Sequence, residues 1–140
     1  MGYRLSILTL AVALGCTPAE TRHTAATLSA EASLPGVPLA LLDGGDTSLP
    51  RFVRDRATLV SFWATWCDAC LEEMPSLNRL AERTAARPDA RVVGVAIGED
   101  PGAVGAFVAA HGLTYAQLVD TQFRLTDALG ERRIPATLVI

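Results

Sequence analysis

The sequence contains no lysine, only three cysteines and two histidines, and few aromatic residues (6%) among its 140 residues. All twelve basic residues are arginines, and they are scattered among fifteen acidic residues, for a formal charge of −3. Nucleic-acid binding needs a concentrated basic surface, so this composition argues against nucleic acid as a partner. Three cysteines exclude a disulfide-framework scaffold. The length and the 50% hydrophobic content are typical of one globular domain with short appendages.

The first fifteen residues contain an apolar run that is too short to span a membrane comfortably. Arg4 is followed by an uncharged stretch at residues 5–15. A helix of about eleven residues covers only about 17 Å of a roughly 30 Å hydrocarbon core. A short apolar run after a positive start is typical of a secretory signal peptide, which is removed from the mature protein.

The end of this run, VALGC at residues 12–16, resembles the lipobox of bacterial lipoproteins, in which a small residue precedes a cysteine that receives lipid. Ala13 and Leu14 depart from that pattern, which usually has Leu and then a small residue at these positions. The resemblance implies that residues 1–15 are a lipoprotein-type signal peptide. It also implies that lipid on Cys16 anchors the exported protein to a membrane, facing the periplasm or extracytoplasmic space. Ordinary cleavage nearby and a free Cys16 thiol are the alternatives.

After the signal peptide, the composition predicts a tether and then an α/β domain. Residues 16–35 lack apolar periodicity, which predicts a flexible, lipid-anchored tether. From residue 36 onward, apolar and β-branched runs predict buried strands at 58–64, 91–97, 115–119 and 137–140. Helical periodicity and capping residues predict helices after Ser48 and at 68–86, 101–111 and 122–129. Strands that alternate with helices imply βαβ crossovers and a largely parallel sheet.

Cys67 and Cys70 form a C-x-x-C pair where a predicted buried strand meets the following helix. The unpaired N–H groups and positive dipole of a helix start favour a thiolate over a thiol. We therefore expect Cys67 to be an exposed nucleophile and Cys70 a shielded resolving thiol in thiol–disulfide exchange. The alternatives are a zinc site, which lacks two further ligands, a structural disulfide, whose short loop restrains the unfolded chain little, and a Cu(I)-binding module. We predict no metal and no nucleotide cofactor, since no phosphate-binding glycine loop is present.

Three segments resemble those of a known family. The stretch SFWATWCDACLEEMPSL at residues 61–77 resembles the active-site segment of the membrane-anchored, thioredoxin-like reductases of the TlpA/ResA type, within the redoxin group. RRIPAT at residues 132–137 resembles the family's Gly-Ile/Val-Pro-Thr turn, and residues 93–115 resemble its extra strand-to-helix insertion. The resemblance implies a thioredoxin-like fold over residues 36–140, with a mixed, mostly parallel sheet and flanking helices. It also implies protein-disulfide reductase activity.

The resemblance also assigns roles to individual residues. Glu73 matches a buried glutamate beneath the disulfide that helps to move protons as Cys70 ionises; the alternative is a solvated helix acid. Pro135 matches a cis-proline that faces the disulfide and leaves a strand edge free for the substrate chain. Trp66 and Ile134, which flank the reactive cysteine and this proline, are expected to bind substrate, with a place in the core as the alternative for Trp66.

The implied partners are client proteins with disulfides, among them proteins whose cysteines await haem attachment or copper loading, and a membrane thiol–disulfide electron donor. A thiol oxidant or isomerase is the alternative enzyme. Ala69 stands where the family usually has a proline, and Asp68 places a negative charge beside Cys67. Both residues affect the reactivity of the cysteine pair, but the sequence alone does not give the direction of the effect. The family continues past the cis-proline strand with a further strand and a helix. We therefore expect residues 137–140 to form an unprotected edge strand, and the 140-residue chain to aggregate or to be molten. An inactive fragment is an alternative to the reductase.

Overall fold

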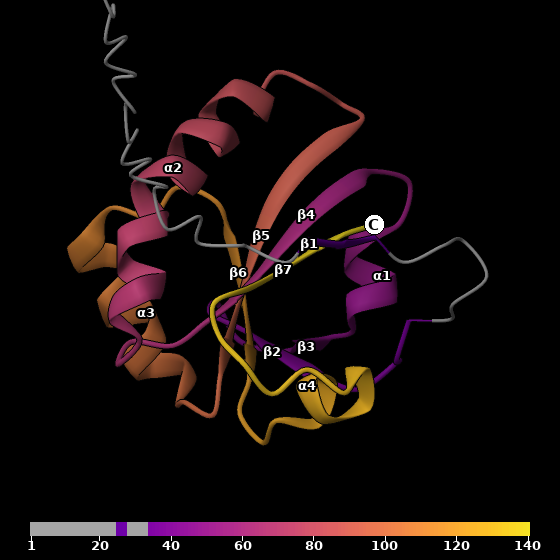
Figure 1. Cartoon of the computed structure of the whole chain (residues 1–140), viewed down its shortest axis with the longest axis vertical. Helices are drawn as coiled ribbons and strands as arrows, with labels where there is room; N and C mark the ends of the chain where they lie inside the picture. Colours follow the sequence, from indigo (N-terminus) through magenta and orange to yellow (C-terminus); the bar gives the residue numbers. More distant parts are fainter. Residues whose placement is uncertain (1–24, 28–33) are drawn as a thin grey trace, which may run out of the picture.

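The computed structural model describes residues 25–27 and 34–140, which form one mixed sheet with helices on both sides (Figure 1). The strand order is β1-β7-β4-β5-β6-β2-β3. The strands are β1 (Ala25–Thr27), β2 (Leu39–Leu41), β3 (Asp46–Thr47), β4 (Ala57–Trp63), β5 (Ala90–Ile97), β6 (Ala116–Asp120) and β7 (Ala136–Val139). The helices are α1 (Leu49–Val53), α2 (Asp68–Thr84), α3 (Pro101–His111) and α4 (Arg124–Leu129). The predicted α/β class and thioredoxin-like arrangement are confirmed.

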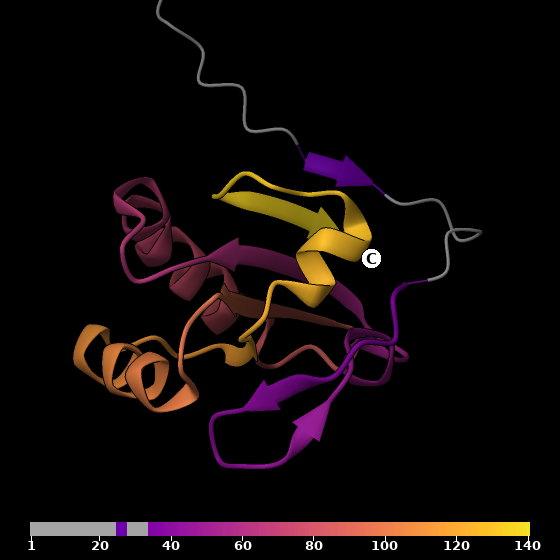
Figure 2. The ribbon, with the colours of Figure 1, turned by 90° about the horizontal axis from the view of Figure 1, so that it is seen from below.

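The centre of the sheet is parallel, and its flanks are mostly antiparallel. β4 pairs in parallel with β5, and β5 with β6, while β7 is antiparallel to β4 and β2 is antiparallel to β6. Helices α2 and α3 lie on one side of the sheet, and α1 and α4 lie on the other (Figures 1 and 2). A parallel strand covered on both faces must be apolar throughout, which explains the continuous apolar runs of β4 and β5.

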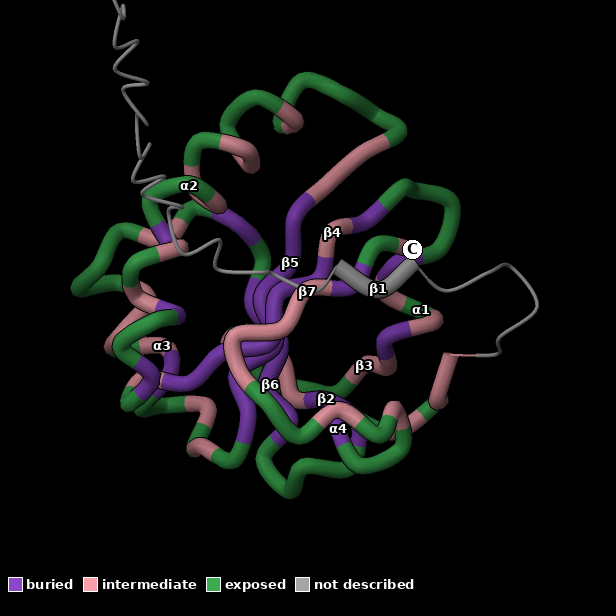
Figure 3. Tube along the Cα trace, in the orientation of Figure 1, coloured by how far each residue is buried: buried purple, intermediate pink, exposed green. Residues whose placement is uncertain are grey.

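The core lies along the carboxyl-terminal parts of these central strands, which are buried and drawn in purple in Figure 3. Trp63 and Phe62 on β4 are almost fully buried, as are Val93 and Val95 on β5 and Leu118 on β6. Trp63 is therefore a core residue. Its indole packs at 5.4 Å, between ring centroids, against the ring of Phe107 on α3, which ties this helix to the sheet.

Helix α3 begins and ends where its sequence signals predict. The Asp100 carboxylate accepts hydrogen bonds from the N–H groups of Gly102 and Ala103, at 2.8 and 3.2 Å. Pro101 occupies the first helical position, where no N–H is needed. Gly112 closes the helix in the left-handed conformation, with φ of 60°, which glycine adopts without a steric penalty.

Two expectations about the edge next to β7 are wrong. Residues Ala25–Thr27 were expected in the flexible tether, but they form β1 and pair in parallel with Thr137–Val139 (Figure 2). β7 therefore lies between β4 and β1, and its backbone is paired on both sides rather than exposed as an edge. A three-residue strand is too short to produce a periodic sequence signal, so its pairing depends on contacts distant in sequence.

The predicted signal peptide at residues 1–15, the lipidation site Cys16 and most of the tether lie outside the described residues, and they stay predictions. Within residues 25–27 and 34–140, none of the helices combines the length and the apolar character that crossing a bilayer requires.

Candidate active site

The carboxyl ends of the three central parallel strands meet at one end of the sheet. Trp63, the last residue of β4, pairs with Ala96, and the last residue of β6 pairs with Ile97, the last of β5. The loops that follow β4, β5 and β6 therefore start side by side, which is where open α/β sheets bind ligands. β7 begins at the same end, since its first residue, Ala136, pairs with Phe62.

Cys67, at the end of the first of these loops, and Cys70, in the first turn of α2, are joined by a disulfide, with Cα atoms 5.2 Å apart. Cys67 is the N-cap residue of α2, and its Sγ accepts a hydrogen bond from the backbone N–H of Cys70, at 3.2 Å. Its sulfur also lies at the positive end of the helix dipole. Both effects stabilise a negative charge on Cys67 once the disulfide is reduced, which is what a nucleophilic thiolate needs.

The two cysteines differ little in exposure in this oxidised state. Cys67 exposes 7% of its surface and Cys70 exposes 2%. Cys67 is the more exposed of the two, as expected for the nucleophile, and Cys70 is the more shielded. Cys67 is nevertheless less exposed than its position at the helix end led us to expect. The physical reason is that the Cys67 side chain packs into the main hydrophobic cluster. Attack by Cys67 therefore requires the client sulfur to come close to the protein surface.

The loop before Cys67 is held by a carboxylate that sequence reasoning missed. Glu99, two residues after the end of β5, accepts a hydrogen bond at Oε2 from the Thr65 N–H, at 3.0 Å. Its Oε1 accepts a second one from the Thr65 hydroxyl. The topology could have revealed this residue, because the loops after β4 and β5 had to be neighbours in a parallel sheet. Glu99 therefore positions the backbone that leads into the reactive cysteine.

A set of polar side chains lies inside the fold next to α2. The Trp63 indole N–H donates to Gln117 Oε1 at 3.0 Å, and Gln117 Nε2 donates to the Tyr115 carbonyl at 3.3 Å. Burial raises the pKa of the Tyr115 hydroxyl, the Gln117 side chain lowers it, and the charge of Glu73 raises it. Glu73, which lies on α2 one turn after Cys70, is half-buried.

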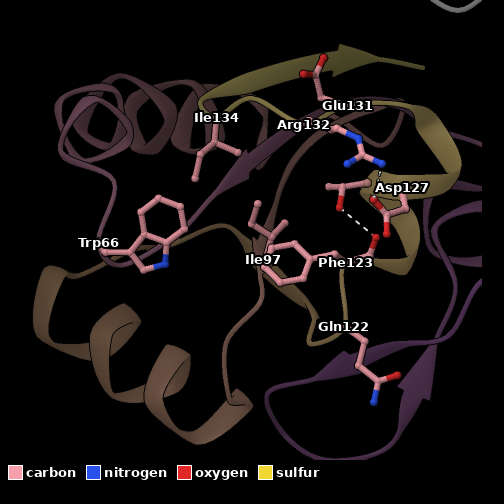
Figure 4. Close-up of a pocket in the computed structure, with 9 residues that line it drawn as sticks. Trp66, Ile97, Gln122, Phe123, Asp127, Glu131, Arg132 and Ile134 are labelled. Carbon is pink, nitrogen blue, oxygen red and sulfur yellow. Dashed lines mark hydrogen bonds and ion pairs between the residues drawn. The ribbon is translucent and has the colours of Figure 1, made fainter.

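Trp66 and Ile134, both predicted to bind substrate, line one cavity of about 380 Å³ (Figure 4). Ile134 precedes Pro135, and the peptide bond between them is cis. One side of the cavity is apolar and the other is polar, as the close-up shows. The apolar lining is Trp66, Ile97, Phe123 and Ile134, and the polar lining is Gln122, Thr126, Asp127, Glu131 and Arg132.

A buried aspartate stabilises the loop on the far side of this cavity through hydrogen bonds to its backbone. Asp120 ends β6, and its carboxylate accepts hydrogen bonds from the N–H groups of Arg124, Leu125 and Thr126, at 2.9 to 3.2 Å. It therefore caps α4, a task that its N-cap residue Phe123 cannot perform with an apolar side chain. This is why α4 begins at Arg124 and not at the predicted residue 122.

No group of three or more histidine, cysteine or acidic side chains in the described parts of the chain is arranged to hold a metal ion. The site instead combines a disulfide at a helix start, a cis-proline and a partly apolar cavity. Fold and site together define a thioredoxin-like protein with a redox-active cysteine pair. The profile of the Redoxin family matches residues 25–140, and the chain belongs to this family. It is a thiol–disulfide oxidoreductase whose redox pair is Cys67 and Cys70.

Its relatives carry corresponding names. Thiol-disulfide oxidoreductase ResA of Geobacillus thermodenitrificans is 31% identical over 135 residues, which are 96% of this chain and 76% of that protein. A crystal structure of a secreted Mycobacterium tuberculosis disulfide oxidoreductase, described as homologous to E. coli DsbE, is 26% identical, with a TM-score of 0.61 over 73% of each chain. A thiol-disulfide oxidoreductase from Bacteroides fragilis, 21% identical, has a TM-score of 0.68 over 78% of this chain and 82% of its own, and shows the same fold.

Proposed function

We propose that this protein is an exported, lipid-anchored reductase of disulfides in client proteins. The observation that carries this proposal is the position of Cys67, whose sulfur caps α2 and faces the N–H of Cys70. That arrangement stabilises the thiolate of the reduced form and so favours Cys67 as attacking and leaving group. The resemblance of residues 61–77 to the TlpA/ResA-type reductases supports the reducing direction.

The proposed exchange moves two electrons from the dithiol to the client. The Cys67 thiolate attacks one sulfur of the client disulfide, which releases the other sulfur as a thiolate and leaves a mixed disulfide. Cys70 then loses its proton and attacks Cys67 Sγ, which frees the second client sulfur and restores the Cys67–Cys70 disulfide. Glu73, half-buried one turn after Cys70, accepts the proton that Cys70 loses.

The client chain lies across the end of the sheet where β7 begins. Pro135 has no N–H, so the backbone there leaves an edge free for an extended substrate segment. Trp66 and Ile134 contact that segment, because they line the cavity and are next to Cys67 and Pro135 in the sequence.

The proposed location rests on residues 1–16, and the secreted relative from M. tuberculosis supports it. A membrane thiol–disulfide donor would re-reduce the protein. The clients of the protein include proteins whose cysteines are prepared for haem attachment or copper loading.

We expect Cys16→Ser to shift the protein from the membrane to the soluble fraction of fractionated cells. An unchanged distribution would contradict lipid anchoring without affecting the redox proposal.

The reduction potential of the Cys67–Cys70 couple tests the direction of electron flow. It can be measured by equilibrating the purified protein with thiol–disulfide buffers of known potential and trapping free thiols. We expect a value near that of thioredoxin, about −270 mV. A value near that of a strong thiol oxidant, about −120 mV, would instead assign oxidation or isomerisation to the same cysteines.

A trapping variant tests the order of the two cysteines. Cys70→Ser removes the resolving thiol, so we expect mixed disulfides with client proteins to accumulate on Cys67 and to disappear on reduction. Cys67→Ser is the matched control and should trap none. Equal trapping by both variants, or none by either in intact cells, would contradict the assigned roles.

A further inference from the structure

The cavity beside the disulfide holds an unusual concentration of exposed apolar surface. Among the described residues, three large apolar side chains are exposed, and two of them, Trp66 at 65% and Phe123 at 43%, line this cavity. In Figure 4 the Phe123 ring lies beside Ile97, and Trp66 and Ile134 complete the apolar side. Exposed apolar surface gathered in one place marks a binding site more often than scattered residues do.

Phe123 is held in a backbone conformation that aromatic residues rarely adopt. Its φ is 57°, in the left-handed region. Its N–H donates to the Asp120 carbonyl at 3.4 Å, and its own carbonyl accepts from the Asp127 N–H at 2.8 Å. Its ring lies directly on Gly98, where a Cβ would come within 2.1 Å of Phe123 Cζ. The surrounding contacts therefore fix both the backbone and the ring, a situation that is common at functional sites.

The apolar side of the cavity continues from the redox site. Trp66 is next to Cys67 in the chain, and Ile134 is next to Pro135. A client sulfur that reaches the buried Cys67 Sγ therefore brings the residues beside the client cysteine over the cavity. The polar side, with Asp127 and Arg132 forming an exposed ion pair at 3.6 Å, lies farther from Trp66 (Figure 4). The position next to the client cysteine thus meets apolar side chains.

We propose that Phe123 is a specificity-determining residue. With Trp66, Ile97 and Ile134, it binds a large apolar side chain, preferably aromatic, that lies within two residues of the client's reactive cysteine. This inference rests on the proposed reductase function and names the class of client that the site prefers. An aromatic side chain fits best because it buries a large area and packs favourably against the rings of Trp66 and Phe123.

The test compares peptide disulfides that differ in one side chain. Short cysteine peptides carry phenylalanine before the cysteine, phenylalanine after it, or serine on both sides, and each is joined to 2-nitro-5-thiobenzoate as a chromogenic mixed disulfide. The fully reduced protein attacks the peptide sulfur through Cys67, the coloured thiolate leaves, and Cys70 releases the peptide thiol. For the wild type, we expect at least one phenylalanine peptide to react roughly 10-fold faster than the serine peptide.

The variants separate a specificity role from a structural one. Phe123→Gly removes the ring but tolerates the left-handed backbone, so it should fold and reduce the preference to about twofold or less. Phe123→Leu should keep part of the preference. Leu113→Ala, in the separate cavity lined by Leu71, Met74 and His111 among others, is the matched control and should leave the ratio unchanged. The thermal unfolding of each variant, followed by circular dichroism, checks that it is folded.

The outcomes distinguish this inference from the function on which it rests. A folded Phe123→Gly variant that slows all peptides equally, or a wild type without any preference, would overturn the role of Phe123 while the reductase function stands. A wild type that reduces neither the peptides nor a small aromatic disulfide would overturn both. A preference that falls only in the Phe123 variants supports the proposal.

Discussion

Gly94, on β5, lies against the buried hydrogen bond between Trp63 and Gln117. A Cβ at this position would lie 2.0 Å from Gln117 Oε1 and 2.8 Å from Trp63 Nε1. We expect Gly94→Ala to break this hydrogen bond and to lower the free energy of unfolding by about 1–3 kcal/mol. Denaturant unfolding followed by tryptophan fluorescence measures this loss.

Gly105 provides the matched control for this substitution. It lies within α3, and a Cβ there would meet no atom within 4 Å. Alanine in a helix interior is favoured over glycine, so Gly105→Ala should raise the free energy of unfolding by about 0.5–1 kcal/mol. The same chemical change should thus have opposite effects at the two sites. Equal effects would show that the packing around Gly94 is looser than described.

The buried hydroxyl of Tyr115 makes stability sensitive to alkaline pH. Burial raises its pKa in the folded protein, so above about pH 10 the unfolded chain loses a proton that the folded protein retains. The free energy of unfolding should therefore fall as the pH rises past about 10. We expect Tyr115→Phe to remove this part of the decline when unfolding of the oxidised protein is compared at neutral and alkaline pH. Tyr115 is the only tyrosine in the sequence after the predicted signal peptide, so no other tyrosine contributes to the decline in the mature protein.

Among individual site residues, the sequence predicted those that belong to a local sequence motif. Cys67 and Cys70 are recognisable from their spacing and from the strand and helix around them. Glu99 and Phe123 were missed because their roles depend on neighbours distant in sequence, namely Thr65 for one and Gly98 for the other. The roles of Glu73 and Pro135 stay predictions.

At the scale of elements, the connection from β4 to α2 depends on the loop after β5. Glu99 accepts two hydrogen bonds from Thr65, and this pair holds the two loops together. We expect Glu99→Ala to lower the free energy of unfolding of the oxidised protein by about 1–3 kcal/mol, because hydrogen bonds to a charged acceptor are lost. It should also slow the reaction of Cys67 with small disulfides, measured by stopped-flow absorbance.

Glu82, exposed on α2, is the control for the Glu99 substitution. Glu82→Ala removes the same charge without touching the loops, so it should change stability by less than about 0.5 kcal/mol. If both variants lost the same stability, net charge rather than the contact with Thr65 would be responsible.

Helix boundaries show which elements a sequence specifies locally. Both ends of α3 were predicted correctly, since Asp100, Pro101 and Gly112 act on adjacent backbone groups. The start of α4 was placed two residues too early, because it depends on the buried carboxylate of Asp120 and on the left-handed backbone of Phe123. Capping residues next to a helix in the sequence can be predicted from the sequence. A capping residue at the end of a preceding strand can be recognised only when the tertiary fold is known.

At the scale of the whole molecule, β1 closes one side of the sheet. Its pairing covers the outer edge of β7, a strand that carries the exposed Val139. We expect a chain that starts at Leu34 to self-associate through the freed edge of β7, whereas one that starts at Thr17 stays monomeric. Light scattering across a range of concentrations measures this difference. Monomers in both cases, with equally slow amide exchange in β7, would show that β1 does not protect the edge.

The position of β1 also sets how far the enzyme can work from a bilayer. With lipid on Cys16, as proposed, only the eight residues 17–24 lie between the anchor and Ala25, a reach of at most about 30 Å. A tether running to residue 35 would have allowed roughly twice that distance. If Cys16 carries lipid, the anchor is joined to the domain by a short segment that ends beside β7, the strand that follows Pro135. The domain would then reach client proteins only close to the membrane, which favours clients that are themselves held at that surface.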